Sequence, residues 1–411
     1  MTSLDILARL AEPETFADPY PFYSWLRDNA PVHRNPTGDI YILSRNADAL
    51  WAYNTPLLRK LEAEEASAKF PRWHKSRLLR TVSRNLAATN PPEHTRLRRV
   101  VARYFTLRQA QHLQDLAELN CGRFVEAVAA KLDDGETVDL HGEFTEPFAI
   151  AMVADVIGVP EGDRQDLAIT VHQAIGSLNP VADDAALKLG DSAAEQVEEY
   201  FTSLIAERQR NPKEDLVSVL MTQLRPDREL GAGLSETELM LMLWGFWLGG
   251  FETTASAMDH GVLAMLDHPE LAGWLSGTPA QSAAFVNEVL RHTPPVMVES
   301  MPRMAIEDIN LDDVTIPAGA DVRMLHGAAN RDPNAFPEPD RFDPIRNTSA
   351  MITFGHGIHH CLGANLARME CSVALSQLHN ALPRIVLAGR PRIQPRLSVR
   401  TFETLPIKLS D

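Results

Sequence analysis

The residues best suited to chemistry lie in one short loop, FGHGIHHCLG, at residues 354–363. The loop contains one cysteine, three histidines and three glycines, and the residues that follow it, ANLARMECSVALSQL, have a helical pattern. Cys361 therefore stands near a helix N-terminus, where unpaired N–H groups and the helix dipole favour a thiolate. A thiolate in this position can act as a nucleophile, a zinc ligand or a haem ligand.

The neighbours of Cys361 suit these three roles unequally. A nucleophile needs a general base at a fixed geometry; His359 and His360 are candidates, although sequence neighbours rarely point at each other. Zinc needs four ligands around one ion, and the three histidines and the cysteine are too close in sequence to enclose it. A haem needs a single cysteine, with glycines that let the backbone approach the macrocycle. Haem ligation therefore fits the loop best.

The composition is that of a globular protein. The chain has 411 residues, of which 45% are hydrophobic, and a formal net charge of −16. A chain this acidic is not expected to bind nucleic acid, because proteins that do so present basic surfaces. Three cysteines are too few for a disulfide framework, which indicates the cytoplasm. We see no signal peptide, and the apolar residues 239–251 are too few to span a membrane, so we expect a buried helix there and no membrane association.

The elements that must position the loop are mainly helical. Helical patterns predominate between residues 91 and 220. Ser235 and Glu238 form a capping-box pattern, which predicts the start of a long helix that ends before Pro269. Strand-like patterns are fewer and shorter, and a proline-rich stretch at residues 330–344 predicts irregular structure. The predicted strands are at residues 38–45, 309–314 and 322–325.

A polar group interrupts the long apolar helix. The sequence GGFETT brings Gly249, Glu252 and Thr253 into it. A buried carboxyl group costs free energy unless it is paired, and adjacent glycines weaken a helix. The glycines leave room beside the helix, and a threonine hydroxyl can take up a displaced backbone hydrogen bond or hold a water molecule. A structural helix with a satisfied polar kink would show the same pattern.

Two further patterns also have ordinary explanations when each is taken alone. Glu288 and Arg291 form an ExxR pattern, which is common in solvated ion pairs on helix surfaces. The stretch PPEHTRLRR places His94 and Arg98 one turn apart on the same helix face, as a solvated basic helix would.

Taken together, these residues resemble the cytochrome P-450 family, the haem-thiolate monooxygenases. The pattern Phe354-x-x-Gly357-x-His359-x-Cys361-x-Gly363 is similar to the haem-binding signature of that family, and the resemblance covers essentially the whole chain. It implies a mainly α fold with a small β region, in a single prism-shaped domain. Within residues 1–411, the β-rich parts are expected near residues 30–60, 305–330 and 385–411.

The resemblance also implies a cofactor and roles for individual residues. The cofactor is haem b (iron protoporphyrin IX), with Cys361 as the axial ligand of the iron. Glu252 and Thr253 are implied to deliver protons to iron-bound dioxygen. The other implied haem-binding residues are His94, Arg98, Arg303, His359, Phe354, Gly355, Gly357, Gly363 and Gly249, of which the two histidines and two arginines would bind the propionates.

A buried network behind the haem loop is a further implication of the resemblance. Glu288, Arg291 and Arg341, the last from the proline-rich stretch, are expected to form it. Removing one member would leave a buried charge uncompensated, so folding or haem retention should suffer before chemistry does.

The resemblance implies a dioxygen-dependent reaction with electrons from a separate ferredoxin and ferredoxin reductase. The expected reaction is hydroxylation or epoxidation of a small to medium-sized hydrophobic or amphipathic molecule, in secondary metabolism or catabolism. Oxidative coupling or desaturation by the same haem is the first alternative. A non-catalytic haem binder and a zinc hydrolase are more distant alternatives, and the Glu252–Thr253 pair speaks against the former.

The sequence offers two hints about the substrate. Residues 69–84 carry six Lys or Arg and no acid. Such a run is commonly a solvated loop, but Arg72 and Arg77 would also suit an acidic substrate or one tethered to an acidic carrier protein. Arg96 and Arg99 are candidates to face an acidic redox partner, and solvated surface residues are the alternative. The resemblance also implies the walls of a substrate pocket, from the loop before His94 and from residues 165–190, 243–253, 296–301 and 400–402, with Glu299 facing a substrate or an arginine.

Overall fold

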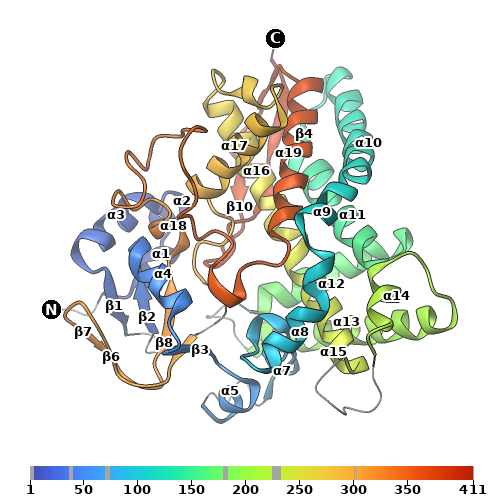
Figure 1. Ribbon diagram of the computed structural model, residues 1–411. Helices are drawn as coiled ribbons and strands as arrows, with labels where there is room; N and C mark the ends of the chain where they lie inside the picture. Colours follow the sequence, from blue (N-terminus) through green and yellow to red (C-terminus); the bar gives the residue numbers. More distant parts are fainter. Residues whose placement is uncertain are drawn as a thin grey trace. The chain divides into compact units, whose positions relative to one another are not determined.

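The structure is a computed structural model that describes residues 4–36, 40–69, 75–178, 184–224, 233–299, 301 and 303–410. The described chain is mainly helical with several small sheets (Figure 1). It divides into two compact units. Unit 1 comprises Met1–Arg59, Ala110–Phe148 and Thr253–Asp411, and unit 2 comprises Lys60–Gln109 and Ala149–Glu252.

The largest sheet has the strand order β1-β2-β8-β5-β3. Its strand β2 is buried on both faces, which explains the continuous apolar run IYIL. Because successive side chains point to opposite faces, Tyr41 and Leu43 join one hydrophobic cluster, whereas Ile40 and Ile42 join another. The strands are β1 (Val32–Asn35), β2 (Ile40–Leu43), β3 (Leu58–Lys60), β5 (Arg303–Ala305) and β8 (Asp321–Met324).

Three smaller sheets complete the β structure of the described residues. One pairs β12 with β4 and β9, one pairs β10 with β11, and one pairs β6 with β7. All these strands except β4 lie in or beside stretches where β structure was expected, and β4 is a two-residue strand with no pattern of its own. The bounds are β4 (Val138–Asp139), β6 (Ile309–Leu311), β7 (Val314–Ile316), β9 (Ile385–Leu387), β10 (Arg392–Ile393), β11 (Phe402–Thr404) and β12 (Pro406–Leu409).

Helix α19, which follows the cysteine loop, packs against two other helices of unit 1. This helix contacts α10 and α17, and Figure 1 shows α10 beside it. The helices wholly or mainly in unit 1 are α1 (Ile6–Ala11), α2 (Pro13–Ala17), α3 (Tyr20–Asn29), α4 (Asn46–Asn54), α10 (Gln114–Asp133), α16 (Glu252–Asp267), α17 (Pro279–His292), α18 (His326–Ala329) and α19 (Ala364–Ala381). They are joined by the π-helical turn η4 (His141–Thr145) and the 3-10 turns η6 (Ala272–Trp274) and η7 (Gly357–His359). The sequence of α9 (Leu107–His112) is divided equally between the two units.

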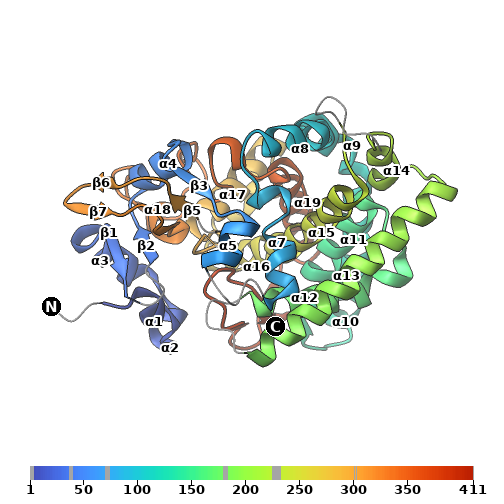
Figure 2. The same cartoon turned by 90° about the horizontal axis from the view of Figure 1, so that it is seen from below.

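Unit 2 is built around the long helix α13, which contacts α7, α12, α14 and α15; Figure 2 shows α13 running along α12. Its helices are α5 (Ala63–Lys69), α7 (Arg77–Val82), α8 (Glu93–Val101), α11 (Glu146–Ile157, which begins in unit 1), α12 (Arg164–Ser177), α13 (Asp184–Arg210), α14 (Leu216–Met221) and α15 (Glu236–Gly250). The 3-10 turns are η2 (Leu86–Ala88), η3 (Ala102–Tyr104) and η5 (Glu161–Asp163).

The long helix expected from Ser235 to near Pro269 is two helices. The capping box forms as predicted, since Glu238 N–H donates to the Ser235 hydroxyl and the Glu238 carboxylate accepts from Ser235 N–H. The first helix, α15, ends at Gly250, and α16 begins at Glu252. A Cβ on Gly250 would lie 2.6 Å from Val153 Cγ2, so α11 closely approaches the chain at this break. No helix in the described part of the chain is long and apolar enough to cross a membrane.

A buried ion pair fixes α16 to η4. His141 Nδ1 lies 2.7 Å from Asp259 Oδ2, and the Thr145 hydroxyl donates to Oδ1 of the same carboxylate at 2.6 Å. Burial alone would lower the pKa of His141, but the Asp259 carboxylate outweighs it, with Glu146 adding to the effect, and raises the pKa to about 9. The imidazole is therefore a cation at neutral pH, and it anchors in unit 1 the helix that carries Thr253.

Candidate functional site

The cysteine loop has the tight backbone that its glycines predict. Gly355 and Gly357 have φ angles of 64° and 68°, in the left-handed region that favours glycine. A Cβ on Gly357 would lie 2.8 Å from the carbonyl oxygen of Tyr53, so the loop packs directly on the end of α4. The Cys361 N–H donates to the Phe354 carbonyl at 2.8 Å, and the thiol side chain is exposed. The loop therefore presents one sulfur at the start of α19.

A cation that the sequence analysis missed lies near this sulfur. The Arg368 guanidinium is 4.3 Å from the ring centroid of Phe354, and its Nε donates to Asn287 Oδ1 at 2.9 Å. Burial lowers the pKa of Arg368, and Cys361 opposes that effect, so the two groups interact electrostatically. The only indication of this role in the sequence is that Arg368 lies in the first turns of the helix that follows Cys361.

The ExxR residues are brought together in the interior of unit 1. Glu288 and Arg291 are both fully buried, and the guanidinium donates twice to the carboxylate, at 2.8 and 2.7 Å. Arg291 Nη1 also donates to the carbonyls of Asn330 and Pro339, each at 2.9 Å. This pair therefore ties α17 to the irregular stretch before the cysteine loop, which is the geometry expected of a structural network.

The third cation of this network is Arg346, and the choice of Arg341 was wrong. Arg346 Nε lies 3.2 Å from Glu288 Oε1, and its side chain is 7% exposed. The Arg341 side chain is 60% exposed and pairs with Asp343 at 2.5 Å. The physical reason is that this stretch has no regular period, so sequence spacing does not say which arginine turns inward.

Arg303, at the start of β5, is a buried cation with spare hydrogen-bonding capacity. Its guanidinium carbon is 4.7 Å from the ring centroid of Tyr53, and its Nε is 3.5 Å from Glu299 Oε1. Among the described residues, neither Nε nor Nη2 has a hydrogen-bond partner. Buried guanidinium groups normally complete their hydrogen bonds, and a carboxylate is the acceptor that suits them best. This cation therefore fits a haem propionate.

Glu299 has partners within the protein. The Tyr53 hydroxyl donates to Glu299 Oε2 at 2.8 Å and lies 2.6 Å from His326 Nε2. Burial raises the pKa of Tyr53 well above its ordinary value, and Glu299 adds to the effect. Of the two expectations for Glu299, a nearby arginine and a substrate group, the structure supplies the arginine.

Haem fits the residues of unit 1. The chemistry of the site is one exposed thiol at a helix start, two positive-φ glycines in its loop, and a buried guanidinium with unused donors. His359 is half-buried on η7, and nothing lies within 4 Å of a Cβ placed on Gly363. The described residues contain no group of three or more His, Cys, Asp or Glu that could hold a metal ion without haem.

In unit 2, α8 presents the other two residues expected at the propionates. His94 is buried, whereas Arg98 is half-buried one turn further along. Burial lowers the pKa of His94 to about 4, and the neighbouring Arg98 adds to the effect. The helix therefore offers a neutral imidazole beside a cation. Arg96 turns to other partners, Glu93 and Glu238, so its charge is used within unit 2; Arg99 is exposed.

The acid expected to deliver protons is deeply buried. Glu252, the first residue of α16, is 2% exposed, and Thr253 beside it is half-buried. Glu252 Oε1 lies 3.9 Å from Nδ1 of His172, on α12. Nothing lies within 4 Å of a Cβ placed on Gly249, which leaves open space beside the helix, as the sequence predicted. The only earlier indication of His172 was its position in an expected pocket wall, residues 165–190.

The basic stretch has a partner inside unit 2. Arg77 donates to Glu195 and Glu198 of α13, at 2.6 and 2.8 Å. Its charge is therefore already balanced, which weakens the case for Arg77 as a substrate-binding residue. Arg72 lies outside the described residues.

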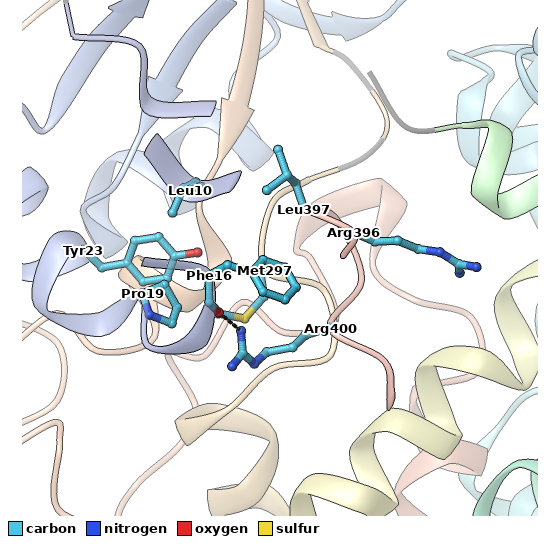
Figure 3. A pocket seen from close by; sticks show the side chains of 8 residues that line it. All are labelled: Leu10, Phe16, Pro19, Tyr23, Met297, Arg396, Leu397 and Arg400. Carbon is cyan, nitrogen blue, oxygen red and sulfur yellow. Dashed lines mark hydrogen bonds between the residues drawn. The ribbon is translucent and has the colours of Figure 1, made fainter. Parts of the chain in front are cut away.

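Two of the expected pocket walls meet in unit 1 at a small pocket (Figure 3). Met297 and Arg400 line it, together with Phe16 and Tyr23. Its volume is about 20 Å³, room for little more than a water molecule. The Arg400 guanidinium donates to the carbonyls of Phe16 and Ala17, at 2.7 and 2.8 Å. The Arg400 guanidinium therefore holds the C-terminal end of α2.

Comparisons with known proteins agree on one family. The family model described as Cytochrome P450 matches residues 52–273 and 282–380. Cytochrome P450 BJ-3 of Bradyrhizobium diazoefficiens is 41% identical over 98% of this chain and 96% of its own length. The vitamin D(3) 25-hydroxylase of Pseudonocardia autotrophica is 34% identical over 95% and 94%. The crystal structure of P450BioI in complex with hexadec-9Z-enoic acid ligated acyl carrier protein superposes with a TM-score of 0.87 at 30% identity, covering 97% of this chain and 100% of that one.

Proposed function

Because the chain belongs to the cytochrome P450 family, we propose that it hydroxylates or epoxidises a small to medium-sized hydrophobic or amphipathic molecule, using dioxygen. The family, the mainly α fold, the oxidoreductase class and the haem cofactor predicted from the sequence are confirmed. The observation that carries the proposal is the single exposed thiol of Cys361 at the start of α19, in front of the buried ExxR pair.

Each haem-binding residue has a distinct task in this proposal. Cys361 would bind the haem iron through its sulfur, and Arg368 would supply positive charge near that sulfur. His94, Arg98, Arg303 and His359 donate hydrogen bonds to the propionates. The glycines at positions 355, 357, 363 and 249 would let the backbone come close to the macrocycle, and the Phe354 ring would hold Arg368 near Cys361. Bound haem supplies the iron at which dioxygen binds and its O–O bond is cleaved.

Proton delivery is the task of α16 in this proposal. Glu252 holds a proton at its buried carboxyl, and the Thr253 hydroxyl next to it passes a proton toward the bound dioxygen. The intact acid–alcohol pair supports oxygen activation over the alternative of a non-catalytic haem binder. Oxidative coupling or desaturation would use the same residues, and mass analysis of the product after reaction in ¹⁸O₂ separates them, because only insertion retains a labelled oxygen.

The partners proposed are a ferredoxin and its reductase, with the protein acting in the cytoplasm in secondary metabolism or catabolism. A second substrate class is an acyl chain tethered to an acidic carrier protein. What supports it is the similarity to P450BioI, whose structure contains an acyl carrier protein ligated to hexadec-9Z-enoic acid. Since Arg77 is already paired, residues of 69–84 other than this one would have to meet the carrier.

The test is the absorption spectrum of the purified protein after reduction and exposure to carbon monoxide. Thiolate ligation by Cys361 gives a strongly red-shifted Soret band, and Cys361→Ala should lose it. A band typical of histidine ligation in the wild type would contradict the proposal. Thr253→Ala should keep the band and divert reducing equivalents to hydrogen peroxide, and tight coupling in that variant would contradict the role of Thr253.

A further inference from the structure

Within the described part of the chain, the Arg303 guanidinium keeps two hydrogen-bond donors unused although a carboxylate lies beside it. Its Nε is 3.5 Å from Glu299 Oε1, and among the described residues neither Nε nor Nη2 has a hydrogen-bond partner. The two side chains are only 4% and 10% exposed. A buried guanidinium and carboxylate normally close to direct hydrogen bonds of about 2.7–2.9 Å. Another contact must therefore hold this carboxylate away from the guanidinium.

The Tyr53 hydroxyl is that contact. It donates to Glu299 Oε2 at 2.8 Å, which binds the carboxylate to α4. Burial raises the pKa of Tyr53 well above its ordinary value, and Glu299 adds to the effect, so the hydroxyl keeps its proton for this bond at neutral pH. His326 Nε2 lies 2.6 Å from the same hydroxyl oxygen. Because the only hydroxyl hydrogen goes to Glu299, Nε2 is the donor to the tyrosine oxygen. Two hydrogen bonds thus fix the hydroxyl.

The ring of the same tyrosine orients Arg303 and touches the cysteine loop. The guanidinium carbon is 4.7 Å from the ring centroid, which is a cation–π contact. A Cβ on Gly355 would lie 3.5 Å from Tyr53 Cε1, and a Cβ on Gly357 would lie 2.8 Å from the Tyr53 carbonyl oxygen. All these residues belong to unit 1. One side chain therefore meets the loop of Cys361, holds the cation with its ring, and holds the neighbouring carboxylate with its hydroxyl.

We infer that Tyr53 is a positioning residue for haem binding: its hydroxyl holds the Glu299 carboxylate, so that the Arg303 guanidinium stays available to a haem propionate. The inference rests on the proposed role of Arg303 at the propionates. Without the hydroxyl, the carboxylate can turn toward the guanidinium and compete with the propionate for its donors. Removing this competitor should then reverse the effect of removing the hydroxyl, which a merely structural tyrosine would not predict.

The first test measures how fast ferric haem passes from the holoenzyme to an excess of apomyoglobin, followed by Soret absorbance. Tyr53→Phe keeps the ring and removes the hydroxyl. Its haem transfer should be about tenfold faster, the size expected for the loss of one charge-assisted hydrogen bond. In Tyr53→Phe/Glu299→Gln the rate should return close to that of the wild type, because an uncharged amide competes weakly for the guanidinium. A double variant that loses haem as fast as Tyr53→Phe, or faster, would overturn the inference.

The second test asks whether Tyr53 acts through Arg303. Arg303→Gln should also speed haem transfer, and adding Tyr53→Phe to it should change the rate by about twofold at most, whereas two effects that multiply would contradict the inference. If Arg303→Gln does not retain haem, the first test decides alone. Tyr41→Phe is the matched control, because it removes the hydroxyl of another tyrosine in the same hydrophobic cluster, and its haem transfer should match the wild type.

The outcomes separate this inference from the proposed function. Each variant should keep the red-shifted Soret band after reduction and exposure to carbon monoxide, because Cys361 is untouched. If the band is present and Tyr53→Phe transfers haem at the wild-type rate, the inference is wrong and the proposed function stands. If Arg303→Gln transfers haem at the wild-type rate, the role of Arg303 at the propionates fails and the inference fails with it. If the wild type lacks the band, the proposed function itself fails.

Discussion

The buried pair between His141 and Asp259 should make the stability of this protein depend on pH in a defined window. The ordinary pKa of histidine is 6.5, and here the carboxylate raises it to about 9 against the effect of burial. Between these two values the folded chain binds more protons than the unfolded chain. Stability from this pair is therefore fully present below pH 6.5 and is lost as pH rises through 9.

The size of the effect follows from the same values. Each pH unit between the two pKa values contributes about 1.36 kcal/mol, so the interval from 6.5 to about 9 corresponds to about 3 kcal/mol. The Asp259→Asn variant keeps the shape of the side chain and removes its charge. It should lose about 3 kcal/mol of unfolding free energy at pH 6.5, and much less at pH 9.

The assay is urea unfolding of the holoenzyme, followed by far-ultraviolet circular dichroism at several pH values between 6 and 9.5. The quantity of interest is the difference in unfolding free energy between wild type and Asp259→Asn. Glu146→Gln is the control, because Glu146 is 3.7 Å from the imidazole and partly exposed, so its removal should change the difference only slightly. A wild-type-minus-variant difference that is constant across the window would refute the reasoning.

Two further predictions concern packing and the buried network. Arg346→Ala should lower the midpoint of urea unfolding, since the buried glutamate of α17 loses a cation, whereas Arg341→Ala should leave the midpoint unchanged; equal effects would contradict the assignment. Gly250→Ala should cost about 1–3 kcal/mol in the same measurement, because its Cβ would meet Val153. Gly245→Ala is the control on the same helix, because its Cβ would lie at an ordinary contact distance of 3.8 Å from Asn85 Cβ; it should be neutral or stabilising by up to about 1 kcal/mol, and a loss equal to that of Gly250→Ala would show that packing is not the cause.

Local signals in the sequence predicted the features that depend on local chemistry. The capping box at Ser235, the positive-φ glycines of the cysteine loop, and the ExxR pair at one helical turn each follow from residues that are close in the chain. The resemblance to a family added the haem and the axial role of Cys361.

What the sequence left open depends on contacts between distant segments. The network around Glu288 contains Arg346 and not the expected Arg341. Both lie in an irregular stretch, which has no period from which one could deduce the side chain that points inward. His172 meets Glu252 across 80 positions of sequence, and β4 exists only because β12 pairs with it. The close approach of Val153 to Gly250, just before the break between α15 and α16, is likewise a contact between distant segments.

Arg400, near the C-terminal end of the sequence, binds both the N-terminal helix α2 and the helix α16. Its guanidinium binds the carbonyls of Phe16 and Ala17, and its own carbonyl accepts a hydrogen bond from the Ser256 hydroxyl of α16, at 2.6 Å. A shortened chain that begins after Ala17 would leave this guanidinium without two of its acceptors. Removing the N-terminal residues to obtain a smaller protein would therefore loosen the segment that holds α16, the helix that carries Thr253. We expect this damage to appear as less product formed per electron consumed, and not as the loss of a folded unit.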